Sequence, residues 1–145
     1  MASLRQFLLQ KKYHRIKLLK TATNHLSLKA CINNVEGNFI LDTGASNSCI
    51  GTAEADHFKL FSEDSDVRAA GAGSINMLTR ISTDNEVKIG NWTKRKVDLV
   101  LFNMKHINQA LQNHDTEVVH GIIGADLLEK GKAVIDYKRR CLYLK

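Results

Sequence analysis

Residues 39–46 read Phe-Ile-Leu-Asp-Thr-Gly-Ala-Ser, and this stretch decides how the rest of the chain is interpreted. An apolar run ends in an acid, Asp42, and a carboxylate at the end of a buried strand is costly unless neighbouring groups stabilise it. Thr43, Gly44 and Ala45 supply a hydroxyl, a backbone that is free to turn, and little bulk. The stretch is typical of a loop that fixes a carboxylate, although an Asx turn that merely ends a strand has the same pattern.

A second motif lies far downstream. Residues 121–128 read Gly-Ile-Ile-Gly-Ala-Asp-Leu-Leu, and they are followed by Ala-Val-Ile-Asp-Tyr at 133–137 and Cys-Leu-Tyr-Leu at 141–144. Together with Asp-Thr-Gly-Ala, this combination resembles the retropepsin-like aspartic proteases, the single-lobed relatives of the retroviral proteases, and most of all their bacterial members. The resemblance covers residues 24–145. It implies an all-β fold (mainly β with short helices), a half-barrel with one lobe per chain that is closed by homodimerisation.

The resemblance also implies roles for individual residues. Asp42 would be the catalytic acid, Thr43 would bond across the dimer axis, and the Gly44 N–H would reach the carboxylate. The segment Ile122-Ile123-Gly124 would pack beneath the Asp42 loop, and the terminal strand 141–144 would join a sheet between two chains. The substrate-binding positions would be Ala45 and the tip of a flap that closes over an extended peptide: Ala70, Gly71, Ala72, Gly73 and Ser74.

The chemistry that follows from this assignment needs two carboxylates at one peptide carbonyl. The ionised one activates a water, and the protonated one polarises the carbonyl. The chain has one Asp-Thr-Gly and no internal repeat that would supply another. Asp126 is expected inside a short helix, where a capping or dipole role suits it, and Asp136 faces a basic turn. A catalytic Asp42 therefore requires the Asp42 of a second copy, on the axis of a C₂ homodimer.

We therefore expect an aspartic endopeptidase that hydrolyses peptide bonds in extended polypeptide segments, without a cofactor or a metal. The alternative is a non-catalytic module of the same fold that binds peptides or dimerises. The six histidines show no ligand spacing, and His120 fits a hydrogen-bonded or exposed residue better than a ligand. The three cysteines include no C-x-x-C pair, which disfavours a zinc site or a disulfide framework.

Length and charge complete the expectations. The 145 residues are enough for one domain, and the net charge of +6 is concentrated in residues 1–20, which hold six basic residues and no acid. We divide the chain into a basic N-terminal arm, 1–23, and a protease domain, 24–145. The arm could contact nucleic acid or an acidic surface, extend into solvent, or dock on the body. No apolar run could span a membrane and no secretory pattern begins the chain, so a cytoplasmic location is the default.

The hydrophobic pattern predicts a mainly β arrangement. The strands are expected at residues 26–32, 38–41, 48–50, 75–81, 86–89 and 96–102, then at 118–123, 133–137 and 141–144. A turn is expected at Asp84-Asn85, and a hairpin tip within residues 67–75. Short helices are expected at 52–60, capped by Thr52, and at 106–112 and 125–130.

Overall fold

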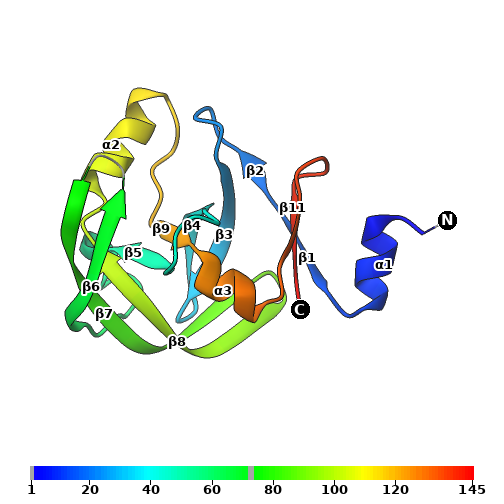
Figure 1. The fold of residues 1–145 in the computed structure, drawn as a ribbon, viewed down its shortest axis with the longest axis horizontal. Coiled ribbons are helices and arrows are strands. Elements are labelled where there is room, and N and C mark those ends of the chain that lie inside the picture. The colour runs from blue at the N-terminus through cyan, green and yellow to red at the C-terminus, as the bar shows by residue number, and fades with distance from the viewer. Residues whose placement is uncertain (1, 72–73) are drawn as a thin grey trace.

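The structure, a computed structural model, describes residues 2–71 and 74–145, with side chains described outside residues 65–77. Strands dominate the described part of the chain, and the helices are short (Figure 1). The elements in chain order are α1 (Leu4–Gln10), β1 (His14–Lys17), β2 (Leu19–Lys20), β3 (Leu26–Ile32), β4 (Val35–Leu41), β5 (Cys49–Gly51), the 3₁₀ turn η1 (Thr52–Glu54), β6 (Glu63–Gly71), β7 (Ser74–Ile89), β8 (Trp92–Phe102), α2 (Lys105–Asn113), β9 (Gly121–Ile123), α3 (Ala125–Lys130), β10 (Val134–Asp136) and β11 (Cys141–Leu144).

The larger of two sheets forms a barrel. Its eight strands run in the order β2-β3-β4-β9-β5-β8-β7-β6, and an additional pairing joins β3 to β7. This pairing closes the ring β3-β4-β9-β5-β8-β7 within one chain, whereas the half-barrel expectation left closure to a second copy. The expected class, mainly β with short helices, is confirmed.

The core lies inside this ring and explains the alternation in the sequence. In β3 the buried side chains are Leu28, Ala30 and Ile32, and the intervening residues are more exposed. Phe39 of β4 and Ile123 of β9 belong to the same buried cluster, which also includes residues of β7, β8 and α3. Each large apolar side chain buried in this way contributes about 1.5–3 kcal/mol to folding.

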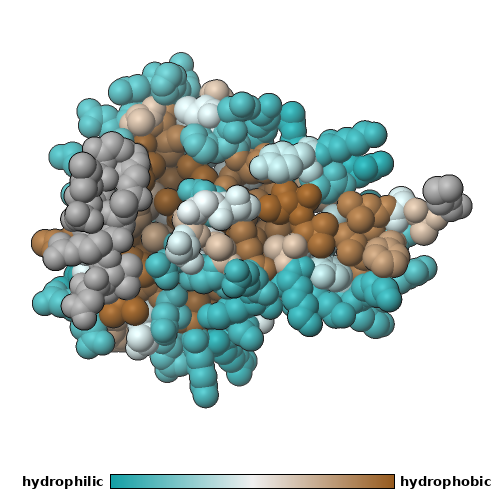
Figure 2. Space-filling view, in the orientation of Figure 1, coloured by the Kyte–Doolittle hydropathy of each residue, from teal (hydrophilic) through white to brown (hydrophobic). Residues whose placement is uncertain are grey.

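The N-terminal residues are docked on the body. Strand β1 pairs with β11, and β10 pairs with the other edge of β11, so these three strands form the second sheet. Helix α1 begins with a capping box between Ser3 and Gln6. Its Leu8 packs against Cys141 and Tyr143 on one face of this sheet. Figure 2 shows apolar surface that continues onto α1 at the right-hand end of the molecule.

The position of β11 corrects one expectation. One edge is paired with β1 over residues 141–144, and the other is paired with β10 over residues 141–143. A strand in the centre of a sheet has no free backbone groups for a further strand. Residues 141–143 therefore do not provide a free edge for a sheet between two chains in this structure.

The predicted helix 52–60 was wrong. Only η1 is helical there, the residue before it is Gly51, and the Thr52 side chain caps nothing. Phe58 and Leu60 are both buried in the core. Because Phe58 and Leu60 are two residues apart, a helix would place them on different sides, and both could not enter the core. The chain instead turns at Lys59, which has a φ of 57°.

The predicted turn at Asp84-Asn85 was also wrong, because these residues lie within the single strand β7. The register to β8 shifts between Ser82 and Asn85, and Asp84 has a φ of 61°. Such a shift is a β-bulge. Asn85 is buried there, and its amide donates to the carbonyls of Ser82 and Val97.

The other expected strands and helices are present with shifts of a few residues at their ends, whereas α1, β1, β2 and β6 were not among the expected elements. Strand β3 and helix α3 match the expected ranges, while β9 is confined to Gly121–Ile123. The predicted hairpin tip is bracketed by Gly71 and Ser74, which pair with each other, and residues 72–73 lie outside the described residues. In the described part of the chain, no helix is both long and apolar enough to cross a membrane.

Candidate active site

The Asp42 loop connects two strands that lie on either side of β9. Strand β4 pairs with β9 in parallel, with Leu41 opposite Ile123. Strand β5 pairs with β9 in the antiparallel sense, with Cys49 opposite Ile122. The Asp42 N–H donates to the Ile123 carbonyl at 3.0 Å. The first residue of the loop is therefore tied directly to β9.

The carboxylate of Asp42 is held by its own turn. The Gly44 N–H donates to Asp42 Oδ1 at 2.9 Å, and the Ala45 N–H donates to the Asp42 carbonyl at 3.2 Å. A Cβ atom at position 44 would lie 3.3 Å from Oδ1, which is closer than an ordinary contact. Asp42, Thr43 and Gly44 are exposed in the single chain, and Ala45 is half-buried. The carboxylate is thus both positioned and accessible.

The far end of the loop is clamped to helix α3 by Asp126. Its Oδ1 atom accepts from the Ser48 N–H at 2.9 Å and from the Ser48 hydroxyl at 2.7 Å. The same oxygen accepts from the Leu127 N–H at 2.8 Å. Ser48 is buried, and its Oγ in turn accepts from the Gly124 N–H at 2.8 Å. The helix-terminal role expected of Asp126 is therefore only part of what this side chain does.

Close backbone contacts explain both glycines of Gly-Ile-Ile-Gly. A Cβ atom at Gly121 would lie 2.2 Å from the Cys49 carbonyl oxygen. One at Gly124 would lie 2.6 Å from the Ala45 oxygen and 2.9 Å from the Asn47 oxygen. Such separations are far inside van der Waals contact. The two glycines therefore allow β5 and the Asp42 loop to pass directly over the second motif.

The two isoleucines of this motif have different surroundings. Ile123 is 1% exposed and belongs to the main core. Ile122 is half-buried and packs on a smaller cluster that includes Ile40, Cys49 and Val100. The motif thus anchors the loop through Ile123 and leaves part of Ile122 accessible on the opposite face of β9.

Cys49 lies immediately after the loop and carries a neutral thiol. Burial, together with the negative charges of Asp126 and Asp42, raises its pKa to about 12. Its Sγ donates to the Asn47 carbonyl at 3.2 Å. A thiol with so high a pKa is not an activated nucleophile. Cys49 is therefore not a candidate nucleophile of this loop.

The His120 side chain is held by a hydrogen bond from the backbone and by ring contacts. Its Nδ1 accepts from the Asn38 N–H at 2.9 Å, so the proton of the neutral ring lies on Nε2. The ring stacks on His57 with 5.7 Å between centroids and meets the edge of Phe58 at 5.5 Å. This histidine contributes to packing between β4 and the chain after η1.

The hairpin β6–β7 contains the predicted flap. Near its base, Arg80 donates to Asp64 Oδ1 at 2.7 Å and to the Ser62 hydroxyl and carbonyl at 2.9 Å each. These bonds fix the start of β6 against β7. Of the predicted flap-tip residues, Ala70, Gly71 and Ser74 have strand backbones, while Ala72 and Gly73 lie outside the described residues.

The described side chains do not form a metal centre. Among the residues whose side chains the structure describes, no three His, Cys, Asp or Glu residues gather closely enough to hold an ion. The clamp formed by Asp126 and Ser48 was not foreseen. The two residues are 78 positions apart, and no spacing in the sequence relates them.

The chain was compared with known proteins. The profile of the family described as aspartyl protease matches residues 28–127. No curated protein matches the chain in sequence.

Solved structures resemble the fold. A retropepsin-like aspartic protease from Rickettsia conorii is 22% identical, with a TM-score of 0.60 and coverage of 91% of this chain and 89% of its own. The retroviral protease-like domain of Ddi1 from Leishmania major is 19% identical, with a TM-score of 0.57 and coverage of 83% and 88%. The EIAV protease, complexed with the inhibitor HBY-793, is 20% identical, with a TM-score of 0.51 and coverage of 76% and 90%. The fold is therefore retropepsin-like, as the sequence motifs indicated.

Proposed function

The chain belongs to the aspartyl protease family, and from this premise we propose that it is an endopeptidase whose catalytic acid is Asp42. The observation that carries the proposal is the geometry of the Asp42 loop. An exposed carboxylate receives the Gly44 N–H, while β9 and Asp126 fix the two ends of the loop. A site that performs acid–base chemistry on a peptide needs a carboxylate that is both fixed and accessible.

The proposed reaction uses two copies of the chain. Two like charges about 3 Å apart do not both ionise, so a pair of Asp42 side chains shares one proton. The ionised member takes a proton from a water, which attacks the peptide carbonyl. The protonated member donates a hydrogen bond to the carbonyl oxygen. Because each chain supplies one such acid, the enzyme is a C₂ homodimer with the site on its axis.

The neighbouring residues have supporting roles in this proposal. Thr43 bonds across the axis and locks the two loops together, and Gly44 keeps its N–H on the carboxylate. Ile122, Ile123 and Gly124 support the loop from below. Ala45 and the flap tip at residues 70–74 bind the substrate. An extended peptide lies between flap and loop and forms main-chain hydrogen bonds as an added strand.

Cleavage of an unbiased peptide library by the wild type and by Asp42→Asn tests the proposal. The assay covers about pH 4–7, the range in which a carboxylate pair carries one proton. The matched control is Asp98→Asn, which changes an exposed aspartate of β8. The dimer fraction is recorded in the same buffers by analytical ultracentrifugation.

We expect cleavage by the wild type and by Asp98→Asn, and none by Asp42→Asn, with the same dimer fraction in all three. Cleavage by Asp42→Asn would contradict the proposal. A confirmed wild-type dimer that cleaves nothing would contradict it as well, and would support the non-catalytic peptide-binding module instead.

A further inference from the structure

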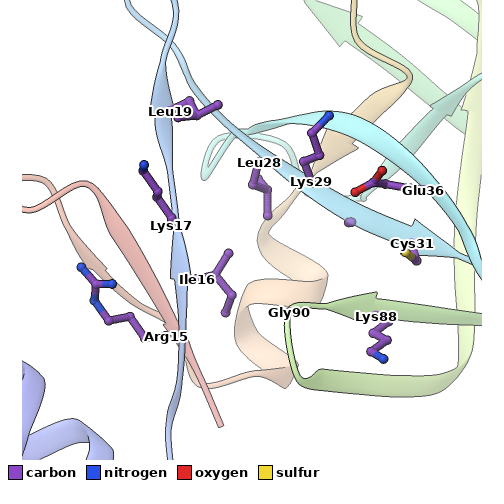
Figure 3. Close-up of a pocket in the computed structure, with 11 residues that line it drawn as sticks. Arg15, Ile16, Lys17, Leu19, Leu28, Lys29, Cys31, Glu36, Lys88 and Gly90 are labelled. Atoms are coloured by element: carbon purple, nitrogen blue, oxygen red, sulfur yellow. The ribbon is translucent and has the colours of Figure 1, made fainter.

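A groove lies on the outside of the barrel, between β1 on one side and β3 with the β7–β8 turn on the other (Figure 3). Its volume is about 640 Å³, within the range of about 300–1,000 Å³ that is typical of ligand sites. Leu19 closes one end, and Gly90 lies at the other. None of the loop residues 42–48 lines it.

The backbone of β1 presents free hydrogen-bonding groups to this groove. The Leu18 N–H donates to the Arg140 carbonyl, which continues the pairing of β1 with β11. Hydrogen bonding in an antiparallel pair alternates along the strand. Ile16 therefore bonds toward β11, and the N–H and C=O groups of Arg15 and Lys17 face the opposite edge, which is the groove.

The facing edge of β3 has a matching gap. On this edge His25 bonds to Thr21, Ser27 is paired with Leu19 of β2, and Cys31 is paired with Lys88 of β7. The alternation directs the N–H and C=O of Lys29 to the same edge, between the two pairings. Among the described strands, β1 is not paired with β3. Lys29 thus faces Arg15 and Lys17 across the groove with its backbone unpaired.

The side chains of the groove separate into an apolar floor and a basic outer face. Ile16, Leu28 and Ala30 are buried in the main core and form the floor. The outward residues Arg15, Lys17, Lys29 and Lys88 are exposed, and the lining contains one acid, Glu36. No ion pair between described side chains involves any of the four basic residues.

We propose that this groove binds an extended polypeptide segment with alternating acidic and apolar residues, as a strand added between β1 and β3. The unpaired backbone edges on both flanks supply main-chain hydrogen bonds. Successive side chains of a strand point to opposite faces. The apolar side chains of the bound segment lie on Ile16 and Leu28, and its carboxylates lie among the lysines and Arg15. The site is independent of the proposed peptidase activity.

Binding of a labelled peptide tests this proposal. The probe is Glu-Val-Glu-Val-Glu with blocked ends, measured by fluorescence polarisation on the full-length chain carrying Asp42→Asn, so that cleavage does not interfere. We expect saturable binding. Replacement of the glutamates by glutamine should weaken it by about tenfold, because the carboxylates lose their charged partners. N-methylation of the valine amides should have an effect of about the same size, because it removes main-chain donors.

Protein variants and a direct backbone readout complete the test. Lys29→Glu and Lys88→Glu should each weaken binding by about tenfold, while Lys105→Glu on α2 should not change it. In hydrogen exchange measured by NMR, the bound peptide should protect the amides of Arg15, Lys17 and Lys29. The amide of Ile16, which already bonds within the sheet, serves as the control.

Three results would overturn the proposal. The first is an absence of saturable binding, and the second is equal binding of the N-methylated peptide, which would exclude strand addition. The third is tighter binding of single-stranded RNA of the same net charge, with a steep dependence on salt. That result would identify a nucleic-acid surface instead.

Discussion

At the scale of single residues, the two glycines near Asp42 should respond differently to alanine. Gly124→Ala forces a Cβ to within 2.6 Å of the Ala45 oxygen, and backbone cannot move aside as a flexible side chain can. We expect the free energy of unfolding to fall by about 1–3 kcal/mol. A Cβ atom at position 44 would contact only Asp42 Oδ1, at 3.3 Å. In urea unfolding, Gly44→Ala should therefore lower the free energy of unfolding less than Gly124→Ala does. Per folded molecule, it should reduce peptidase activity more. Equal losses of stability would contradict this reading.

The bond between Ser48 and Asp126 should show strong energetic coupling. Ser48→Ala leaves the Gly124 N–H without its buried acceptor, and Asp126→Ala leaves the Ser48 N–H and hydroxyl without theirs. Each change should cost about 1–3 kcal/mol in urea unfolding. The double variant should cost about 1 kcal/mol less than the sum of the single variants. Additive effects would show that the two residues act separately.

The Cys49 thiol makes stability depend on alkaline pH. Because its folded pKa is raised from 9.0 to about 12, the unfolded chain loses this proton first. Between pH 9 and about pH 12, the native state therefore binds more protons than the unfolded chain. The free energy of unfolding should fall over this range, by up to about 1.4 kcal/mol per pH unit. Urea unfolding of the wild type and Cys49→Val at pH 8, 9, 10 and 11 measures the difference. Parallel curves for the two proteins would contradict the assigned pKa.

Much of the candidate site could be predicted at this scale, because its motifs are local. Asp42-Thr43-Gly44 and Gly-Ile-Ile-Gly are contiguous runs that can be identified in the sequence without knowing which residues contact them. The contacts that make them necessary are between distant residues. The need for glycine at 124 arises from the Ala45 and Asn47 carbonyls, and Asp126 acts on Ser48. Only the folded chain brings these groups together.

At the scale of elements, the docking of α1 depends on one side chain. Leu8 is 5% exposed and packs on β11, whereas Leu9 is 44% exposed. Leu8→Ala should lower the free energy of unfolding by about 2–5 kcal/mol, because it removes buried apolar volume. Leu9→Ala is the matched control, with an expected change within about 0.5 kcal/mol. Equal effects of the two substitutions in urea unfolding would show that α1 is not docked as described.

Element prediction succeeded where one face of a segment is buried and failed where burial and local pattern conflict. The alternation of apolar and polar residues in 26–32 indicates which side chains enter the barrel. Residues 52–60 have a helix-like composition, but Phe58 and Leu60 must both reach the core, which a helix does not allow. Asp84-Asn85 has the composition of a turn, yet the buried amide of Asn85 holds it in a bulge.

At the scale of the whole molecule, a site shared by two chains makes an inactive subunit inhibitory. In the proposed homodimer, wild type mixed with an excess of Asp42→Asn would form heterodimers, each with one functional carboxylate. Activity per wild-type chain should therefore fall steeply as the variant is added, provided that the subunits exchange. The measurement is peptidase activity against mixing ratio after equilibration, with Asp98→Asn as the control partner. Activity that stays proportional to the wild-type chain would contradict a shared site.

The pairing of β1 with β11 also has a consequence for how this protein is made. Strand β1 leaves the ribosome early, whereas its partner, which places Leu144 opposite His14, is translated more than a hundred residues later. Contacts between such distant segments form late, because a long loop must close first. Throughout synthesis, Leu8 lacks the surface of Cys141 and Tyr143 on which it packs in the folded chain. The nascent chain therefore carries an exposed apolar segment until translation of the last strand is complete, and nascent-chain chaperones that cover such segments should bind it there.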